Sequence, residues 1–187
     1  MTTATKVTLL RLILIPVMVI FWLVPSQEIG FLNLEINQFI AAIIFVVAAA
    51  TDFIDGYIAR KYNQVSNLGK FLDPIADKIL VISAMTYLIS SNRIMFWTVI
   101  VIIFREFVVT GIRLLAVEKG VVIAASPYGK AKTIVTMIAL IMLLFNNLFL
   151  PVIVVDIVWY LAVVLTLFSG LDYLFKNLEV FKEKNKN

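Results

Sequence analysis

Four aspartates stand close together in the chain, at the ends of two apolar segments: Asp52, Asp55, Asp73 and Asp77. The members of the first pair are three residues apart and those of the second pair four apart, so on helices each pair shares one face. Carboxylates gathered at the edge of a bilayer repel one another unless positive charge lies between them. The spacing therefore predicts a site for divalent metal ions at the membrane surface, and chemistry on a phosphate-bearing lipid.

The residue types restrict both the metal and the chemistry. The chain contains no histidine and no cysteine, so catalysis by imidazole or thiolate is excluded. Zinc rarely accepts carboxylates alone, whereas oxygen ligands suit magnesium and manganese. We expect two Mg²⁺ or Mn²⁺ ions that clamp a pyrophosphate. The small residues Gly56, Ala59 and Gly69 would let a nucleotide or phosphate approach the backbone.

Composition places these acids in a membrane protein. Of the 187 residues, 62% are hydrophobic and 15% are charged, and the mean hydropathy is +1.02. Soluble domains average about 45–50% apolar and about 25% charged residues. We predict an all-α integral membrane fold in one domain, residues 1–187, with six transmembrane helices. The predicted spans are 7–25, 38–55, 72–90, 94–117, 131–149 and 152–175. Pro74 would then lie in the first turn of the third span, where proline is tolerated.

Basic residues indicate the orientation of these spans. Of the 16 Lys and Arg, only Arg93 falls on the side opposite to the others in a six-span arrangement. Because cytoplasmic connections carry the excess of Lys and Arg, we expect both termini and the aspartate cluster on the cytoplasmic side. The net charge of +4 is spread between apolar runs, which favours contact with anionic membrane lipid over nucleic acid.

A second group of charges lies in and after the fourth predicted span. Arg105, Glu106 and Arg113 interrupt an apolar helix, and charges inside a membrane are functional hypotheses by default. The two arginines are about 80° apart around a helix, so both can face one cavity and bind an anionic substrate. Glu106 is interpreted as a structural partner of a lysine or arginine. Lys130 and Lys132 either add to this anion site or anchor the fifth span at the inner surface.

The complete acidic pattern resembles the signature of the CDP-alcohol phosphotransferase family. Eight positions match at the permitted spacing: Asp52, Asp55, Gly56, Ala59, Arg60, Gly69, Asp73 and Asp77. The resemblance implies a six-helix membrane enzyme, usually a homodimer, that transfers a phosphatidyl group from a CDP-linked donor to an alcohol and releases CMP. It implies that all four aspartates hold metal and that Asp77 also accepts the alcohol proton. The CDP donor would bind at Asp52, Gly56, Ala59, Arg60, Gly69 and Asp73.

Further stretches are similar to family members that use sn-glycerol 3-phosphate as acceptor. They include residues 7–16, 105–113 and 129–133, although residues 4–6 depart from the usual opening. The resemblance implies CDP-diacylglycerol as donor, phosphatidylglycerol biosynthesis, and a bacterial plasma membrane location. Its acceptor phosphate would be bound by Arg105, Arg113 and Lys130. Arg60 either contacts the donor phosphates or pairs with an aspartate of the signature.

Other functions compete with this interpretation. Within the family, the acceptor could instead be inositol phosphate, serine or phosphatidylglycerol. From another class, a small helical membrane protein with acidic residues could be a cation transporter. Transporters place ion sites near the midplane and are often built of repeats. Here the acids are predicted at the membrane edge and no repeat is evident, which favours the enzyme.

Overall fold

The computed structural model of the chain describes residues 3–29, 34–62, 67–124 and 126–181. Within these ranges the backbone alone is described for residues 3, 4, 29, 52–62, 67, 68, 70 and 179. The described chain forms six long α-helices, two short 3-10 helices and a small antiparallel hairpin. Its internal contacts divide it into two compact units: Met1–Arg93 with Ile141–Phe149, and Ile94–Leu140 with Leu150–Asn187.

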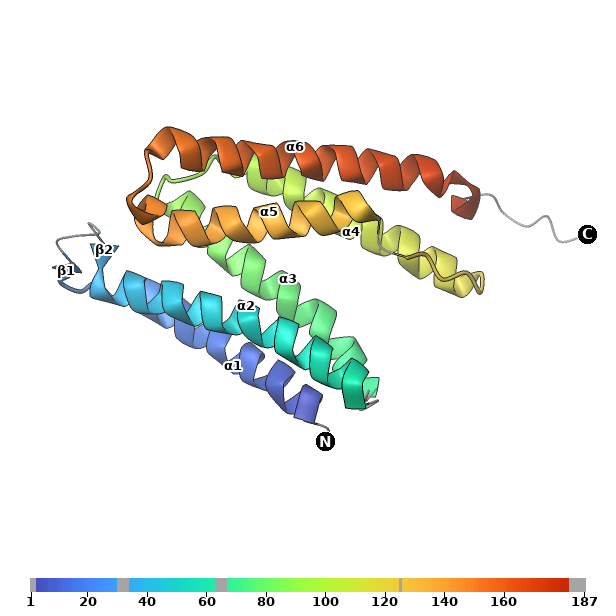
Figure 1. Cartoon of the computed structure of the whole chain (residues 1–187), viewed down its shortest axis with the longest axis horizontal. Helices are drawn as coiled ribbons and strands as arrows, with labels where there is room; N and C mark the ends of the chain where they lie inside the picture. Colours follow the sequence, from blue (N-terminus) through green and yellow to red (C-terminus); the bar gives the residue numbers. More distant parts are fainter. Residues whose placement is uncertain (1–2, 30–33, 63–66, 125, 182–187) are drawn as a thin grey trace, which may run out of the picture. The chain divides into compact units, whose positions relative to one another are not determined.

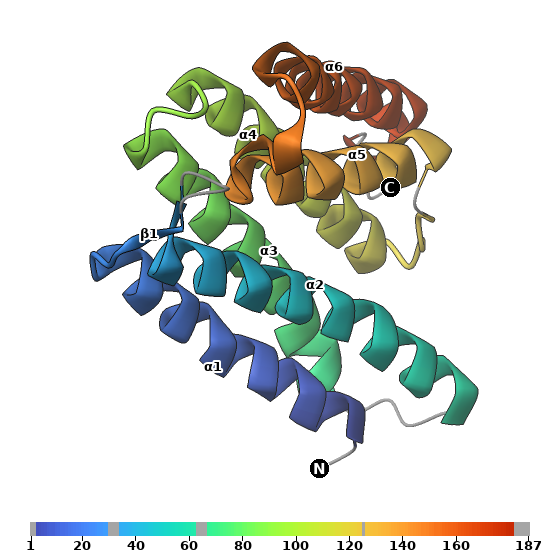
Figure 2. The same ribbon diagram turned by 60° about the vertical axis from the view of Figure 1, so that its left-hand side comes forward.

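The first unit is built on α1 (Thr3–Leu23), α2 (Ile36–Tyr62) and α3 (Asn67–Ser90). α1 packs against both of the other helices, and most closely against α2 (Figures 1 and 2). In a membrane, small side chains let two helix backbones approach, because packing and not water exclusion drives their association. Three alanines of α2 are fully buried in this way: Ala41, Ala42 and Ala48.

The connection between α1 and α2 is tied back to the helix ends. β1 (Glu28–Ile29) pairs antiparallel with β2 (Leu34–Glu35). The backbone N–H of Ser26 donates to Glu35 Oε2 at 2.8 Å, and Asn37 Nδ2 donates to the carbonyl of Val24 at 2.8 Å. These bonds satisfy polar groups where the chain leaves one helix and enters the next.

α3 begins earlier than the third predicted span. The prediction placed the span at 72–90 with Pro74 in its first turn, and this placement of the proline is wrong. The helix starts at Asn67, so Pro74 lies about two turns inside it. A proline there removes one backbone donor from the helix interior. The polar residues before position 72 continue the helix beyond the apolar span, as expected for a helix that extends past the bilayer.

The fifth helix ends before its predicted boundary at residue 149. α5 (Pro127–Leu144) is followed by the 3-10 helix η1 (Asn146–Phe149), in which Asn147 has φ 75°. Asparagine tolerates this left-handed conformation better than most residues. Arg93 donates hydrogen bonds to the side-chain oxygens of both Asn146 and Asn147, so the turn is fixed by a cation from the end of α3. These polar contacts explain why the helix stops where the apolar pattern continues.

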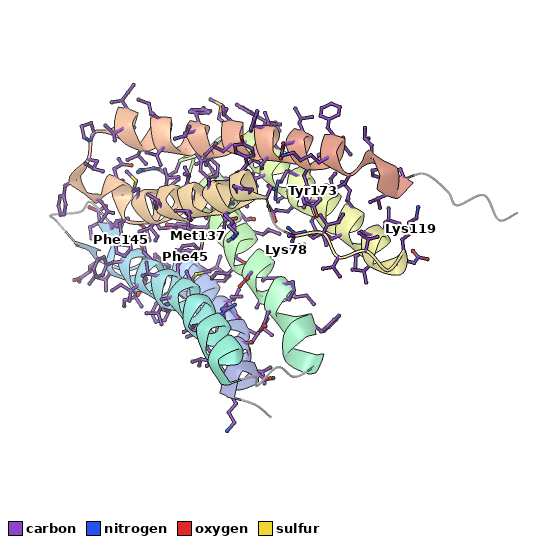
Figure 3. All side chains as sticks on the ribbon, turned by 45° about the vertical axis from the view of Figure 1, so that its right-hand side comes forward. Phe45, Lys78, Lys119, Met137, Phe145 and Tyr173 are labelled. Carbon is purple, nitrogen blue, oxygen red and sulfur yellow. The ribbon has the colours of Figure 1, made fainter. Side chains whose placement is uncertain are left out.

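The second unit contains α4 (Phe96–Glu118), α6 (Val152–Lys176) and most of α5. α4 packs along α6, and Tyr173 on α6 lies between the two helices (Figure 3). Tyr173 is buried in a cluster with Val109 and Ile112. Further along, buried Trp159 donates its indole N–H to Thr98 Oγ1 at 3.2 Å. η2 (Leu178–Phe181) follows α6, and the carbonyl of Val180 accepts from Lys119.

Three described helices are long and apolar enough to cross a membrane: Thr5–Leu23, Pro127–Leu144 and Val152–Lys176. α2 adds a shorter apolar stretch, Ile36–Thr51. α4 carries several charges, and on α3 the acidic residues lie in the first half of the helix. The predicted all-α integral membrane class is confirmed, and each of the six α-helices overlaps one predicted span.

Candidate active site

Asp73 and Asp77 form the described half of the predicted acidic quartet. They lie four residues apart on α3, so their carboxylates are on one face of consecutive turns. Leu80, three residues after Asp77, lies on the same side of the helix as the two acids and is 2% exposed, and the neighbouring Ala76 is 0% exposed. Asp77 keeps 44% of its side-chain surface exposed. The two carboxylates therefore lie at the edge of the buried face of α3, where they remain partly exposed.

Two side chains of α1 contact these carboxylates. Thr8 Oγ1 donates to Asp73 Oδ1 at 2.5 Å, and Arg11 Nη1 donates to Asp77 Oδ1 at 2.5 Å in an ion pair. The spacing of three residues on α1 matches that of four on α3, so each acid receives one donor from the neighbouring helix. Both donors are buried, with Arg11 at 0% and Thr8 at 1% exposure.

Thr8 and Arg11 are functional candidates that the sequence analysis did not single out. They lie within the stretch 7–16, which was used there for its resemblance alone. A signal was nevertheless available, because Arg11 is a charge inside an otherwise apolar span, and such charges are rarely placed without a partner. Thr8 precedes it by about one turn and so shares its face.

The other half of the signature lies at the end of α2, where the backbone alone is described. Asp52, Asp55, Gly56, Ala59 and Arg60 are all helical residues of this segment, and their predicted roles stay predictions. Gly69 lies in the first turn of α3 and is buried. Among the side chains that the structure describes, no group of three or more acidic residues gathers. The side chains of Asp52 and Asp55 lie outside the described set.

The described acids fit a divalent cation by their chemistry. Asp73 and Asp77 offer only oxygen ligands, which Mg²⁺ and Mn²⁺ prefer, and the chain has no histidine or cysteine to favour another metal. Both side chains are partly exposed, so a cation can reach them. The Thr8 and Arg11 contacts act on one oxygen of each carboxylate, Oδ1.

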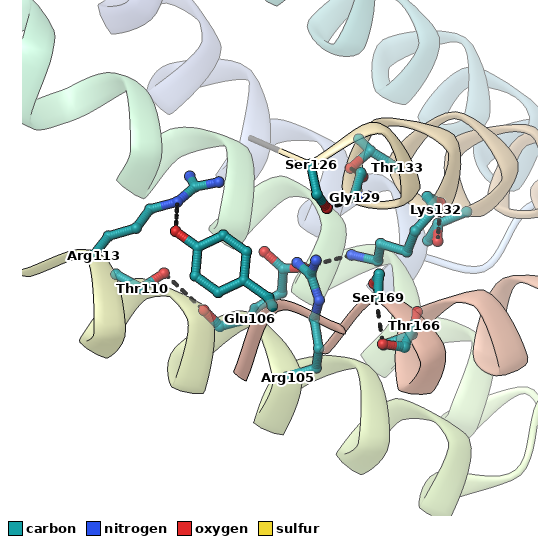
Figure 4. Close-up of polar contacts among 12 residues, drawn as sticks. Arg105, Glu106, Thr110, Arg113, Ser126, Gly129, Lys132, Thr133, Thr166 and Ser169 are labelled. Atoms are coloured by element: carbon teal, nitrogen blue, oxygen red, sulfur yellow. Dashed lines mark hydrogen bonds and ion pairs between the residues drawn. The ribbon is translucent and has the colours of Figure 1, made fainter. Parts of the chain in front are cut away.

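A second polar centre joins three charges in the other unit (Figure 4). Glu106 Oε1 on α4 accepts from Lys132 Nζ of α5 at 2.5 Å and from Arg105 Nη1 at 3.0 Å. The predicted structural pairing of Glu106 with a lysine or arginine is confirmed. Lys132 is buried, with 6% of its side chain exposed, and 11% of the Arg105 side chain is exposed. One carboxylate thus neutralises part of two buried positive charges.

The side chain of Arg105 lies against two glycines, one on α5 and one on α6. A Cβ added at Gly170 would lie 2.9 Å from Arg105 Cγ, and one at Gly129 would lie 3.3 Å from Arg105 Nη2. Neither position has room for a side chain unless the arginine moves. Arg105 Nε is buried and has no hydrogen-bond partner among the described residues. A buried N–H without an acceptor is unfavourable, so this arginine suits a site that receives an anion.

The predicted anion-binding residues are brought together only in part. Arg113 and Arg105 extend from the same side of α4, as the spacing predicts (Figure 4). Arg113 Nε donates to the hydroxyl of Tyr173 at 3.1 Å, and its guanidinium carbon lies 5.5 Å from that ring's centroid. Lys130 is exposed at the start of α5, whereas Lys132 takes the buried place beside Arg105 and Glu106.

Fold and side chains together define a class of protein: an all-helical integral membrane protein with paired aspartates on one helix and buried cations on others. Residues 1–168 match the family model described as CDP-alcohol phosphatidyltransferase, and the chain belongs to this family.

Curated relatives of nearly the same length are similar along the whole chain. A protein of Bacillus subtilis (strain 168) is 43% identical over 187 residues, covering 96% of this chain and 97% of the relative. A Haemophilus influenzae protein is 37% identical over 171 residues, with 89% and 88% covered. A Rickettsia bellii protein is 35% identical over 170 residues, with 89% and 90% covered. All three are named CDP-diacylglycerol–glycerol-3-phosphate 3-phosphatidyltransferase.

Proposed function

We propose that the protein transfers the phosphatidyl group of CDP-diacylglycerol to sn-glycerol 3-phosphate, giving phosphatidylglycerol phosphate and CMP. The observation that carries this proposal is that relatives similar over nearly their full length bear the name of this reaction. The complete aspartate signature of the family supports it, and so does the geometry of Asp73 and Asp77.

In the proposed reaction a glycerol hydroxyl oxygen attacks the phosphorus that carries the diacylglycerol. The bond from this phosphorus to the CMP oxygen breaks, CMP leaves, and Asp77 takes the hydroxyl proton. Asp77 suits this task because it is partly exposed while its Oδ1 is held by Arg11. Fixing an acid near the attacking group and excluding water from one side lowers the barrier through positioning and electrostatics.

The proposed metal and donor sites use the whole signature. Asp52, Asp55, Asp73 and Asp77 would hold two Mg²⁺ or Mn²⁺ ions, which would neutralise charge on the donor pyrophosphate. Asp52, Gly56, Ala59, Arg60, Gly69 and Asp73 would bind the CDP donor. The short side chains at three of these positions leave the backbone accessible.

The proposed acceptor site uses cations of the second unit. Arg105, Arg113 and Lys130 would bind the phosphate of sn-glycerol 3-phosphate, because guanidinium groups match phosphate oxygens. The buried Nε of Arg105 and the exposed ammonium of Lys130 support these roles. Lys132 would act indirectly, since its ammonium already contacts Glu106.

We place the protein in the bacterial plasma membrane as a multi-pass protein, with both termini and the aspartates on the cytoplasmic side. Three long apolar helices and the distribution of lysines and arginines support this orientation. The homodimer that the family resemblance implies stays a prediction.

Release of CMP by the purified protein tests the proposed function. The protein in detergent, with Mg²⁺ or Mn²⁺ and CDP-diacylglycerol, is expected to release CMP when sn-glycerol 3-phosphate is added and not when acceptor is omitted. Inositol phosphate, serine and phosphatidylglycerol are supplied separately as competing acceptors. CMP release with one of these and not with sn-glycerol 3-phosphate would overturn the choice of acceptor. No CMP with any acceptor would favour a transporter.

Replacing Arg113 by Ala is expected to impair use of the acceptor more than use of the donor. Loss of a charge-assisted hydrogen bond to phosphate should raise KM for sn-glycerol 3-phosphate by about 10- to 100-fold. KM for CDP-diacylglycerol should change by less than about 3-fold, because the donor phosphates are assigned to other residues. Steady-state kinetics with each substrate varied in turn measures both values.

Tyr173→Phe is the matched control for Arg113→Ala. It removes the hydroxyl that accepts from Arg113 and keeps the ring buried between α4 and α6. Its kinetic constants are expected to stay near those of the unmodified protein. Equal impairment of both substrates in both variants would mean that Arg113 ties α4 to α6 and does not bind the acceptor.

A further inference from the structure

We propose that Arg11 and Thr8 on α1 are positioning residues, which hold the carboxylates of Asp77 and Asp73 in the orientation that the reaction requires. The inference rests on the proposed function for its meaning in catalysis. Its structural basis is the pair of contacts between α1 and α3, each 2.5 Å long.

The two partners of the Arg11–Asp77 ion pair differ in their exposure. The cation is buried at 0% exposure, whereas Asp77 retains 44%. Arg11 contacts the carboxylate from the buried side, and part of the Asp77 side chain remains accessible from outside the unit.

The second contact makes the attachment of α3 specific. A single bond between two helices permits α3 to rotate about it or to tilt. Thr8 and Arg11 contact acids on consecutive turns, and two such bonds fix both the rotation and the axial position of the acidic face. Hydroxyl and guanidinium donors act at defined angles, so they also restrict the rotamers of the two carboxylates.

The backbone of this part of α3 gives a further reason for external support. Pro74 lies between the two acids and supplies no backbone N–H, so one bond of the helix ladder is missing there. A helix segment with a missing bond is more easily distorted. The contacts from α1 lie on both sides of this proline and stabilise the turn that carries the site.

Four substitutions on α1 separate orientation from charge and from packing. Arg11→Lys keeps the positive charge but loses the planar fork, and Arg11→Met keeps comparable length without charge. Thr8→Ser keeps the hydroxyl, and Thr8→Val keeps the shape without it. Met18→Ala is the matched control, because Met18 is equally buried on α1 and lies about two turns beyond Arg11.

Turnover is expected to follow the donor groups. Arg11→Met and Thr8→Val should lower kcat by about 10- to 100-fold, the factor expected for loss of a hydrogen bond to a charged group. Arg11→Lys should lie between Arg11→Met and the unmodified protein, and Thr8→Ser should stay within about 3-fold of it. KM for sn-glycerol 3-phosphate should change little, because neither residue is assigned to acceptor binding. Met18→Ala should lower the unfolding temperature in detergent without changing kcat.

Binding of Mn²⁺ in the absence of substrate gives a reading independent of turnover. Arg11→Lys and Thr8→Val leave the charge of the site unchanged, so a higher Kd in these variants reports displaced carboxylates. We expect each to raise the Mn²⁺ Kd, measured by electron paramagnetic resonance, by about 3- to 10-fold, with Met18→Ala unchanged. Loss of only the outer-shell support of a ligand has effects of this size or larger.

The possible outcomes are distinct. Folded Arg11→Met and Thr8→Val proteins with kcat and Mn²⁺ Kd within about 2-fold of the unmodified protein would overturn the inference. Equal effects of Met18→Ala would also overturn it, because α1 would then act through packing alone. If Arg11→Met does not fold, Thr8→Val and Arg11→Lys still decide. If the unmodified protein binds Mn²⁺ but releases no CMP with sn-glycerol 3-phosphate, the proposed function fails, and the Mn²⁺ measurements still test the positioning role.

Discussion

Asp77→Asn is expected to reduce CMP release by about 10²- to 10⁴-fold, the contribution usual for a positioned general base. The amide is nearly the same size as the carboxylate but cannot take the proton of the attacking hydroxyl. The substitution should also destabilise the protein, because Arg11 is fully buried and loses the negative charge of a carboxylate that it contacts. Removing one member of a buried ion pair costs about 3–5 kcal/mol, and the exposure of Asp77 places this case near the lower end.

A double variant separates these two effects. Arg11→Met combined with Asp77→Asn removes both charges, so most of the lost stability should return while turnover stays abolished. Thermal unfolding in detergent and CMP release measure the two quantities on the same samples. Asp156→Asn, a carboxylate on α6, is the control and should change neither by much. Near-normal turnover of Asp77→Asn would rule out Asp77 as the base.

The helices could be predicted from the sequence because each long apolar stretch is itself the structural unit. The fourth span, predicted at 94–117, is α4 at Phe96–Glu118. The boundaries of predicted spans and observed helices differ where polar residues continue a helix or interrupt an apolar stretch. α3 extends back to Asn67 through polar residues, and η1 interrupts an apolar stretch because Arg93 binds the two asparagines there. Hydropathy indicates burial in lipid, whereas the polar start of α3 and the contacts of Arg93 do not depend on burial in lipid.

The arrangement of site residues that lie on one helix could be predicted from the sequence. The spacing of Asp73 and Asp77 determines that they share a face, whatever packs against it. The identity of their partners depends on the register between α1 and α3, which is a tertiary property that spacing within one helix does not contain. Thr8 and Arg11 were therefore not assigned, although the charge of Arg11 inside an apolar span was visible.

The roles of the two lysines of α5 could not be predicted for a similar reason. Lys130 and Lys132 are two residues apart, so about 200° separates them around the helix and only one can face α4. Sequence alone does not give the rotation of α5. In the structure Lys132 faces Glu106, whereas Lys130 is exposed. The two lysines therefore have different environments, which composition alone does not reveal.

Glu106→Gln is expected to destabilise the second unit strongly. Its carboxylate contacts both Lys132 and Arg105, and their side chains are only 6% and 11% exposed. The amide of glutamine would leave two buried cations close together without a compensating negative charge. Loss of one partner from a buried ion pair costs about 3–5 kcal/mol, and the repulsion between the two cations adds to it.

Charge balance and shape can be distinguished by a second substitution. Adding Lys132→Met to Glu106→Gln removes one of the two cations, so a large part of the lost free energy of unfolding should be regained. Glu118→Gln, an exposed acid at the end of α4, is the matched control and should stay within about 0.5 kcal/mol of the unmodified protein. Thermal unfolding of the four proteins in one detergent gives the comparison. If Glu106→Gln unfolds at the same temperature as Glu118→Gln, the two cations are balanced by another group and the ion pairs of Glu106 do not hold this unit together.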